Sequence, residues 1–197
     1  MAFRTMEIDA PQELRTGDFL LRPIRVSDAE LDHDAVMESK EFLRKWEQST
    51  WPTDDFTVEA NREDLANLEG RHSTRDAFTY TVMNLNQTEC LGCVYLIAPD
   101  HSMYAGAHVS PLTSDEWSTC DATIFFWVRK SRLAQGLDRA LLDALVSWLD
   151  QEWPFNFPVI VTNEHFEQQV SMLDGTDLRR VFTIKVPSDS GAYLAYA

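Results

Sequence analysis

The chain has 197 residues and a formal net charge of −15, and hydrophobic residues make up 44% of it. This length suits a single domain with one core, and the apolar content is too high for a disordered chain. The excess of acidic side chains repels nucleic acids and anionic lipids, which argues against both as partners. No apolar run approaches the roughly 20 residues that span a bilayer, and residues 1–18 resemble neither a secretory signal nor a transit peptide. We therefore expect a cytoplasmic protein.

The first part of the chain predicts a strand followed by helices. Residues 19–24 (FLLRPI) form a short apolar strand candidate. Segment 27–46 starts with a Ser/Asp cap and acidic residues, which favour a helix N-terminus. A Thr or Asp cap, Glu-rich first turns and a final Gly70 predict a second helix over 53–70.

The middle of the chain predicts a hairpin and a further strand. Residues 77–83 and 88–97 are rich in β-branched and aromatic residues and are separated by the turn residues 84–87, which favours an antiparallel hairpin. Residues 122–128 predict another strand. The intervening segment 98–121 is too long for an ordinary connection. It either forms a wall of a substrate site or is an insertion with no role in chemistry.

The two cysteines closest in sequence lie in the second strand of this hairpin. Cys90 and Cys93 form a CxxC motif. Successive side chains of a strand point to opposite faces, so residues three apart are expected on opposite faces. Cys120, His101 and His108 form no recognised second ligand pair for zinc. The sequence therefore predicts three buried or half-buried thiols and no metal site.

The last third of the chain predicts the longest amphipathic helix and the end of the sheet. Apolar residues recur at helical spacing over 137–148. Residues 154–161 predict a largely buried strand, 163–175 a short helix, and 180–186 with 192–197 a closing hairpin. The aromatic terminal strand could pair across a homodimer.

This order of elements, with the longest amphipathic helix after the fourth strand, resembles the GNAT acetyltransferase superfamily. Three stretches carry the resemblance to the branch that includes ribosomal-protein N-terminal acetyltransferases: FLLRPIRVSDAE (19–30), LGCVYLI (91–97) and ATIFFWVRKSRLAQGLDRALLDAL (122–145). They resemble its opening strand and helix, its glycine-containing third strand and its cofactor segment. The match covers roughly residues 17–197 of a single domain spanning 1–197. It implies an α/β fold of the GNAT-type acyl-CoA N-acyltransferase kind, with a mixed, mostly antiparallel sheet and flanking helices.

The resemblance implies acetyl-CoA as co-substrate, with its pyrophosphate on a loop that opens a helix. Unpaired backbone N–H groups and the helix dipole make such a position attractive to phosphate. The family pattern is Gln/Arg-x-x-Gly-x-Gly/Ala; here Leu133 stands first, Gly136 in the middle and Asp138 last. A carboxylate within about 5 Å of a phosphate costs on the order of 1 kcal/mol or more, whereas aspartate in a first helical turn is favourable with the dipole.

Other groups expected to hold the cofactor flank this loop. By resemblance, main-chain groups of the strand 122–128 hold the pantetheine arm, and an Asn at the end of the next strand helps to position the cofactor. Four cations around the loop either pair with phosphates or form a solvated turn that offsets nearby acids. The expected cofactor-binding residues are Phe126, Val128, Arg129, Lys130, Arg132, Ala134, Gln135, Gly136, Leu137, Asp138, Arg139 and Asn163.

The implied reaction is acetyl transfer to an amine of a small molecule or a protein N-terminus. It needs a deprotonated amine and a proton for the departing thiolate. Asp121 is a candidate base, although direct alignment places Thr123 at that position and an aspartate before a strand is commonly a turn residue. Phe166 stands where relatives commonly have Ser, which removes a usual proton donor. The alternative is a GNAT-fold binding or regulatory protein that has lost cofactor chemistry.

Several aromatic and histidine side chains stay unassigned. Three tryptophans flank predicted loops, where they either form walls of a substrate pocket or pack as a satellite of the core. Three histidines become candidate bases only if the segments that carry them fold toward the site. These residues are Trp46, Trp51, Trp117, His101, His108 and His165.

Overall fold

The structure is a computed structural model that describes residues 3 and 9–197. Its strands are β1 (Leu14–Arg15), β2 (Leu20–Pro23), β3 (Ala77–Met83), β4 (Cys90–Ile97), β5 (His108–Pro111), β6 (Ala122–Val128), β7 (Pro158–Asn163), β8 (Arg180–Lys185) and β9 (Tyr193–Tyr196). Within the described residues they form one nine-stranded sheet in the order β1-β2-β3-β4-β6-β7-β9-β8-β5. Only β6 and β7 pair in parallel there, so the mixed, mostly antiparallel sheet is confirmed.

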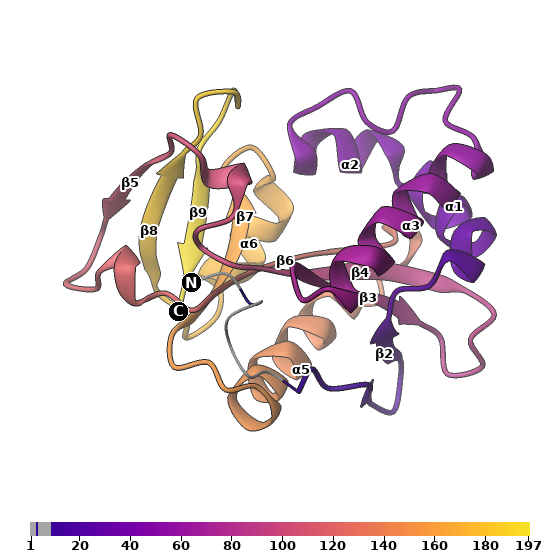
Figure 1. Cartoon of the computed structure of the whole chain (residues 1–197), viewed down its shortest axis with the longest axis horizontal. Helices are drawn as coiled ribbons and strands as arrows, with labels where there is room; N and C mark the ends of the chain where they lie inside the picture. The colour runs from indigo at the N-terminus through magenta and orange to yellow at the C-terminus, as the bar shows by residue number, and fades with distance from the viewer. Residues whose placement is uncertain (1–2, 4–8) are drawn as a thin grey trace.

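Helices cover both faces of this sheet (Figure 1). They are α1 (Ala29–Glu38), α2 (Lys40–Glu47), α3 (Val58–Ser73), α4 (Lys130–Leu133), α5 (Leu137–Glu152) and α6 (Glu167–Asp174). Helices α5 and α6 pack their apolar residues into the core on one face, and α1 and α3 do so on the other face. None of the helices in the described part of the chain is both long and apolar enough to span a membrane.

The predicted helix over 27–46 is in fact two helices that meet at Ser39. Ser39 is fully buried, and its hydroxyl accepts a hydrogen bond from the main-chain N–H of Lys130 at 3.0 Å. The break therefore anchors the α1–α2 junction against the segment that follows β6. The second predicted helix begins at Val58 with Thr57 as its cap and continues past Gly70 to Ser73.

The predicted strands at 77–83 and 122–128 have the bounds that the structure shows, and the closing hairpin is present as β8 and β9. Strand β9 lies between β7 and β8, so both of its edges are paired. It therefore has no free edge with which to pair across a dimer, and that part of the prediction is wrong.

Part of the predicted loop at 98–121 belongs to the sheet. Strand β5 pairs antiparallel with β8 and forms the edge of the sheet. Its four residues, HVSP, are too few and too polar for the sequence pattern to reveal. This segment therefore extends the sheet in addition to connecting β4 with β6.

Strands β6 and β7 stay paired over only part of their length. The parallel pairing joins Ala122–Ile124 to Pro158–Ile160. Strand β6 then continues to Val128 beside β4, while β7 continues to Asn163 beside β9. The sheet therefore opens between the later residues of β6 and β7.

A β-bulge in β4 changes which side chains share a face. Val82 pairs with Gly92 and Met83 with Cys90, so Leu91 is an extra residue on β4. As a result Cys90 and Cys93 both point toward α1 and α3, whereas Leu91 packs in the core on the α5 side. The prediction that the two cysteines lie on opposite faces is wrong, because the alternation rule fails at the bulge.

Gly92 is the residue that this bulge requires. Its φ is +151°, and a Cβ there would lie 2.1 Å from the main-chain oxygen of Trp127. We predict that Gly92→Ala lowers the free energy of unfolding by about 2 kcal/mol or more, because backbone strain and a backbone clash add. Urea denaturation measures this. Gly17→Ala is the control, since nothing lies within 4 Å of its added Cβ; equal effects of the two substitutions would contradict the prediction.

Candidate functional site

Two cavities lie on either side of α2. The first has a volume of about 650 Å³ and lies between α1, α2, α3 and the sheet. Aromatic side chains form much of its wall, namely Trp46, Trp51, Tyr95, Phe125, Trp127 and Tyr193. Two of the three unassigned tryptophans thus line a cavity, whereas Trp117 packs against Tyr104 and Phe182.

Carboxyl groups line the same cavity. Burial raises the pKa of Glu47, and the neighbouring Asp64 raises it further. Burial likewise raises the pKa of Asp64. Both groups therefore hold a proton more readily than an exposed acid does. Sequence reasoning missed them because they lie on helices without any motif.

The second cavity, of about 930 Å³, lies next to the predicted cofactor segment. Its wall is formed by α2, Lys130 and residues 164–168 at the start of α6. Both positive and negative side chains line it, namely Arg44, Lys45 and Lys130 with Glu41, Glu164 and Glu167. His165 also lines this cavity, while the side chain of His101 bonds to Arg71 of the first cavity and His108 lies exposed on β5.

Helix α2 separates the two cavities at the opening between β6 and β7. Phe42 faces the second cavity and packs edge-on against Phe166, with ring centroids 4.4 Å apart. Trp46 lines the first cavity. The Asn163 side chain donates hydrogen bonds to the main-chain oxygens of Lys45, at 2.7 Å, and Trp46. Asn163, predicted to position a cofactor, therefore holds the C-terminal end of α2.

The cations predicted to meet phosphates are paired with acids of the chain itself. Arg129 donates to Glu38 at 2.6 Å and to Asp34 at 2.7 Å. Arg132 bonds to Glu89 at 2.6 Å. Arg139 pairs with Asp143 one turn along α5, at 2.9 Å. Lys130 has no ion pair among the described residues and lines the second cavity.

Glu38 also accepts a hydrogen bond from a main-chain N–H group of the predicted cofactor segment. Its carboxylate accepts a hydrogen bond from the main-chain N–H of Ser131 at 3.0 Å. Burial opposes ionisation of Glu38, but the hydrogen bonds from Arg129 and Ser131 outweigh it and lower its pKa to about 2. An internal carboxylate thus lies where an incoming anion would meet this part of the loop.

Within the described residues, the loop before α5 accepts no main-chain hydrogen bond from the N–H groups of residues 137–139 in the first turn of this helix. Gly136 precedes α5 and has a left-handed backbone conformation, with φ +73°. Helix α5 begins at the buried Leu137. The N–H groups of Gln135 and Gly136 donate to the main-chain oxygens of Arg132 and Leu133 in α4, at 3.1 and 2.9 Å, whereas the first amides of a helix have no partner within it. Ala134 ends the short helix α4 that precedes this loop. These free amides are suited to an anion.

Asp138 turns toward α6 at this helix start. Its carboxylate is buried and accepts a hydrogen bond from the side chain of Gln168. The next residue of α6, Gln169, donates to the main-chain oxygen of Phe126 at 3.0 Å. Val128, the other predicted backbone site, ends β6 opposite Gly92. Two glutamines that no motif marks thus cover groups predicted for the cofactor.

Asp121 has the role of a turn residue. Its carboxylate accepts hydrogen bonds from the main-chain N–H groups of Asn156 and Phe157, the latter at 2.9 Å. It lines neither of the two cavities. The hydroxyl of Thr123 donates to the main-chain oxygen of Ile97 at 2.9 Å.

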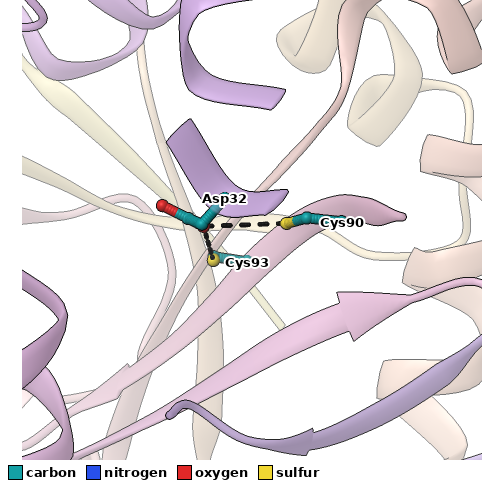
Figure 2. Close-up of side chains that lie close together, drawn as sticks. All are labelled: Asp32, Cys90 and Cys93. Carbon is teal, nitrogen blue, oxygen red and sulfur yellow. Dashed lines mark hydrogen bonds between the residues drawn. The ribbon is translucent and has the colours of Figure 1, made fainter. Parts of the chain in front are cut away.

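A third group of polar side chains comprises Asp32, Cys90 and Cys93 (Figure 2), and two of them, Asp32 and Cys93, line the first cavity. Asp32 projects from α1 toward Cys90 and Cys93 on β4, and all three are fully buried. The Asp32 Oδ1 atom lies 3.6 Å from the sulfur of Cys90 and 3.5 Å from that of Cys93. Burial raises the pKa of Asp32, although hydrogen bonds from Asn61 and the two thiols oppose the shift.

Comparison with known proteins identifies the fold. No protein-family model matches the sequence, and a search of curated proteins gave no match. RimL, a ribosomal L7/L12 α-N-protein acetyltransferase solved with coenzyme A, has a TM-score of 0.65 at 17% identity, over 92% of this chain and 93% of that one. The ribosomal-protein-S5-alanine acetyltransferase from Vibrio fischeri has a TM-score of 0.66 at 14% identity, over 93% and 94%.

A third solved structure extends the comparison. The microcin C7 self immunity acetyltransferase MccE, in complex with acetyl-CoA and AMP, has a TM-score of 0.68 at 12% identity, over 95% of this chain and 96% of that one. The chain therefore has the GNAT acetyltransferase fold, and its structural neighbours include ribosomal-protein N-terminal acetyltransferases. The fold expected from the sequence is confirmed.

The lowered pKa of Glu38 gives a pH test of this site. A carboxylate with a depressed pKa stabilises the fold above its ordinary pKa of 4.5, and this contribution is lost as the pH falls to about 2. We predict that Glu38→Gln destabilises the protein at neutral pH and that the difference shrinks as the solution is acidified.

Urea denaturation over a pH series measures this difference. Glu41→Gln is the control, because it removes an exposed carboxylate that only pairs with Arg44 on the surface of α2. It should have a small effect at every pH. A Glu38→Gln effect of the same size at neutral pH and at a pH of about 2 would contradict the prediction.

Proposed function

We propose that the protein is an acetyl-CoA-dependent N-acetyltransferase that acts on an amine of a small molecule or a protein N-terminus. The observation that carries the proposal is the pair of cavities that flank the opening between β6 and β7. The second cavity is lined by Lys130 and by Gln168, whose side chain bonds to Asp138 in the first turn of α5. A cation and a helix N-terminus so close to the cavity suit the coenzyme A phosphates. The first cavity then receives the amine on the other side of α2.

The lining of the first cavity suits a cationic acceptor. Aromatic faces attract a positively charged amine, and carboxyl groups at the same wall attract it further. Glu47 and Asp64, with raised pKa values, are the candidate bases for removing the proton that the amine must lose before it attacks the thioester. They replace Asp121 in this role, because that carboxylate faces a turn instead of either cavity.

Cofactor binding would require contacts made by α2 and α6 in this structure to be replaced by contacts with the cofactor. The pantetheine arm has to pass the Phe42–Phe166 contact and reach the β6 main chain, where Gln169 now bonds to Phe126. Gln169 is buried, and its Oε1 has no hydrogen-bond partner in the described structure. A pantetheine amide could replace this side chain at the Phe126 oxygen with an equivalent hydrogen bond.

A second candidate function is a binding or regulatory protein that retains the fold without cofactor chemistry. Carboxylates of the chain itself lie where the cofactor phosphates would bind, which favours this candidate. Glu38 accepts a hydrogen bond from the N–H of Ser131, and Asp138 places a carboxylate at the start of α5. Phe166 packs against Phe42 where relatives commonly have a hydroxyl residue. In this reading α2 is a permanent part of the core.

Calorimetric titration with acetyl-CoA distinguishes the two candidates. We expect micromolar binding by the native protein and about fivefold tighter binding by Asp138→Asn, because the substitution removes repulsion of about 1 kcal/mol between the carboxylate and a phosphate. Asp143→Asn is the matched control on the same helix: it lies five residues further along, where it is exposed and pairs with Arg139. It should leave the affinity within a factor of two.

The outcomes separate clearly. Binding by the native protein that is strengthened by Asp138→Asn alone supports the enzyme and leads to a screen of amine acceptors. No heat of binding for the native protein and for both variants, with folding verified by circular dichroism, overturns the acetyl-CoA proposal in favour of the second candidate.

A further inference from the structure

The bulge in β4 brings together three side chains that bind metal ions in many proteins. Asp32, Cys90 and Cys93 each offer one ligand atom, and these atoms all lie within 4.8 Å of one another. They come from α1 and from both sides of the bulge (Figure 2). Regular alternation along β4 would have turned one of the thiols toward α5.

The distances fit a tetrahedral ion. With metal–sulfur bonds of about 2.3 Å and metal–oxygen bonds of about 2.0 Å, a sulfur and an oxygen ligand of such an ion lie about 3.5 Å apart. The Asp32 Oδ1 atom lies 3.6 Å from the Cys90 sulfur and 3.5 Å from the Cys93 sulfur. The three side chains therefore need little rearrangement to become ligands.

The other oxygen of Asp32 is held in place by a neighbouring helix. Asn61 of α3 donates from Nδ2 to Asp32 Oδ2 at 3.0 Å and to the main-chain oxygen of Ala29 at the same distance. Such a partner orients a ligating carboxylate and is a regular part of metal sites. Oδ1 is thereby left to face the two thiols.

An ionised Asp32 would have no cationic partner from the described chain itself. Its side chain is buried, and in the described part of the chain no cationic group pairs with it. The nearby Arg22 is engaged with Asp28, at 2.7 Å. Buried charges are normally paired or coordinate a metal ion.

We propose that Asp32, Cys90 and Cys93 form a binding site for a thiophilic divalent cation such as Zn²⁺. Asp32 and Cys93 line the first cavity, so the ion can enter from it. A water or ligand atom in that cavity completes the tetrahedron. Three protein ligands with one open position are typical of zinc sites that bind a further molecule, whereas closed structural sites use four. The site opens into the cavity proposed above for the amine, but the ligand geometry that supports it does not depend on acetyl transfer.

Titration of the reduced, metal-free full-length protein with Co²⁺ tests the site. We expect one equivalent to bind, with thiolate-to-cobalt charge-transfer absorption and the visible bands of a tetrahedral ion, and Zn²⁺ to displace it. Cys90→Ser and Cys93→Ser should each lose the charge-transfer absorption and weaken binding at least tenfold. Cys120→Ser is the matched control, since that buried thiol packs in a different cluster and bonds to the Ala122 oxygen.

The native protein alone also gives a decisive result if a serine variant does not fold. Native mass spectrometry should show one Zn²⁺ per chain, and Zn²⁺ should raise the melting temperature because it binds only the folded site. Absence of a stoichiometric ion, a cobalt spectrum without thiolate bands, or loss of binding in Cys120→Ser but not in Cys93→Ser would overturn the proposal.

Discussion

The close approach of Gly92 to the main chain of Trp127 is the constraint on which much of this structure depends. The bulge at this point turns Cys90 and Cys93 toward α1 while β4 stays paired with β6. The carbonyl of the extra residue, Leu91, then accepts a hydrogen bond from the N–H of Arg129 at 2.7 Å. One irregularity in β4 thus sets both the buried polar cluster and the start of the segment that follows β6.

The charges of that segment explain how a strongly acidic chain accommodates a run of cations. Arg129 is mostly buried, and its guanidinium group forms ion pairs with both Asp34 and Glu38 of α1. The break at Ser39 directs α2 away from α1 and across the opening between β6 and β7. The same junction therefore neutralises the cations and places α2 between the two cavities.

The sequence predicts the parts of the fold that local pattern governs. Runs of β-branched and aromatic residues define β3 and β6, and the apolar stripe after Gly136 defines α5. The position of the cofactor segment follows from the same pattern. The partners of its side chains do not, because Glu38 and Arg129 lie 91 residues apart and meet only through the tertiary fold. Similarly, no local rule reveals that the Gln169 side chain bonds to the main-chain oxygen of Phe126. Nor does one reveal that the alternation of side chains along β4 breaks at the bulge before Gly92.

The place of β9 in the sheet has a consequence for how the chain is assembled. This strand follows every other strand in sequence, yet it alone joins β7 to β8. During synthesis, β8 and the edge strand β5 can pair with each other but cannot join the rest of the sheet before β9 emerges from the ribosome. Until then the exposed edges of β7 and β8 are open to pairing with other chains, and folding relies on contacts between residues distant in sequence. The chain is therefore exposed to aggregation through these edges until β9 is available to pair with them.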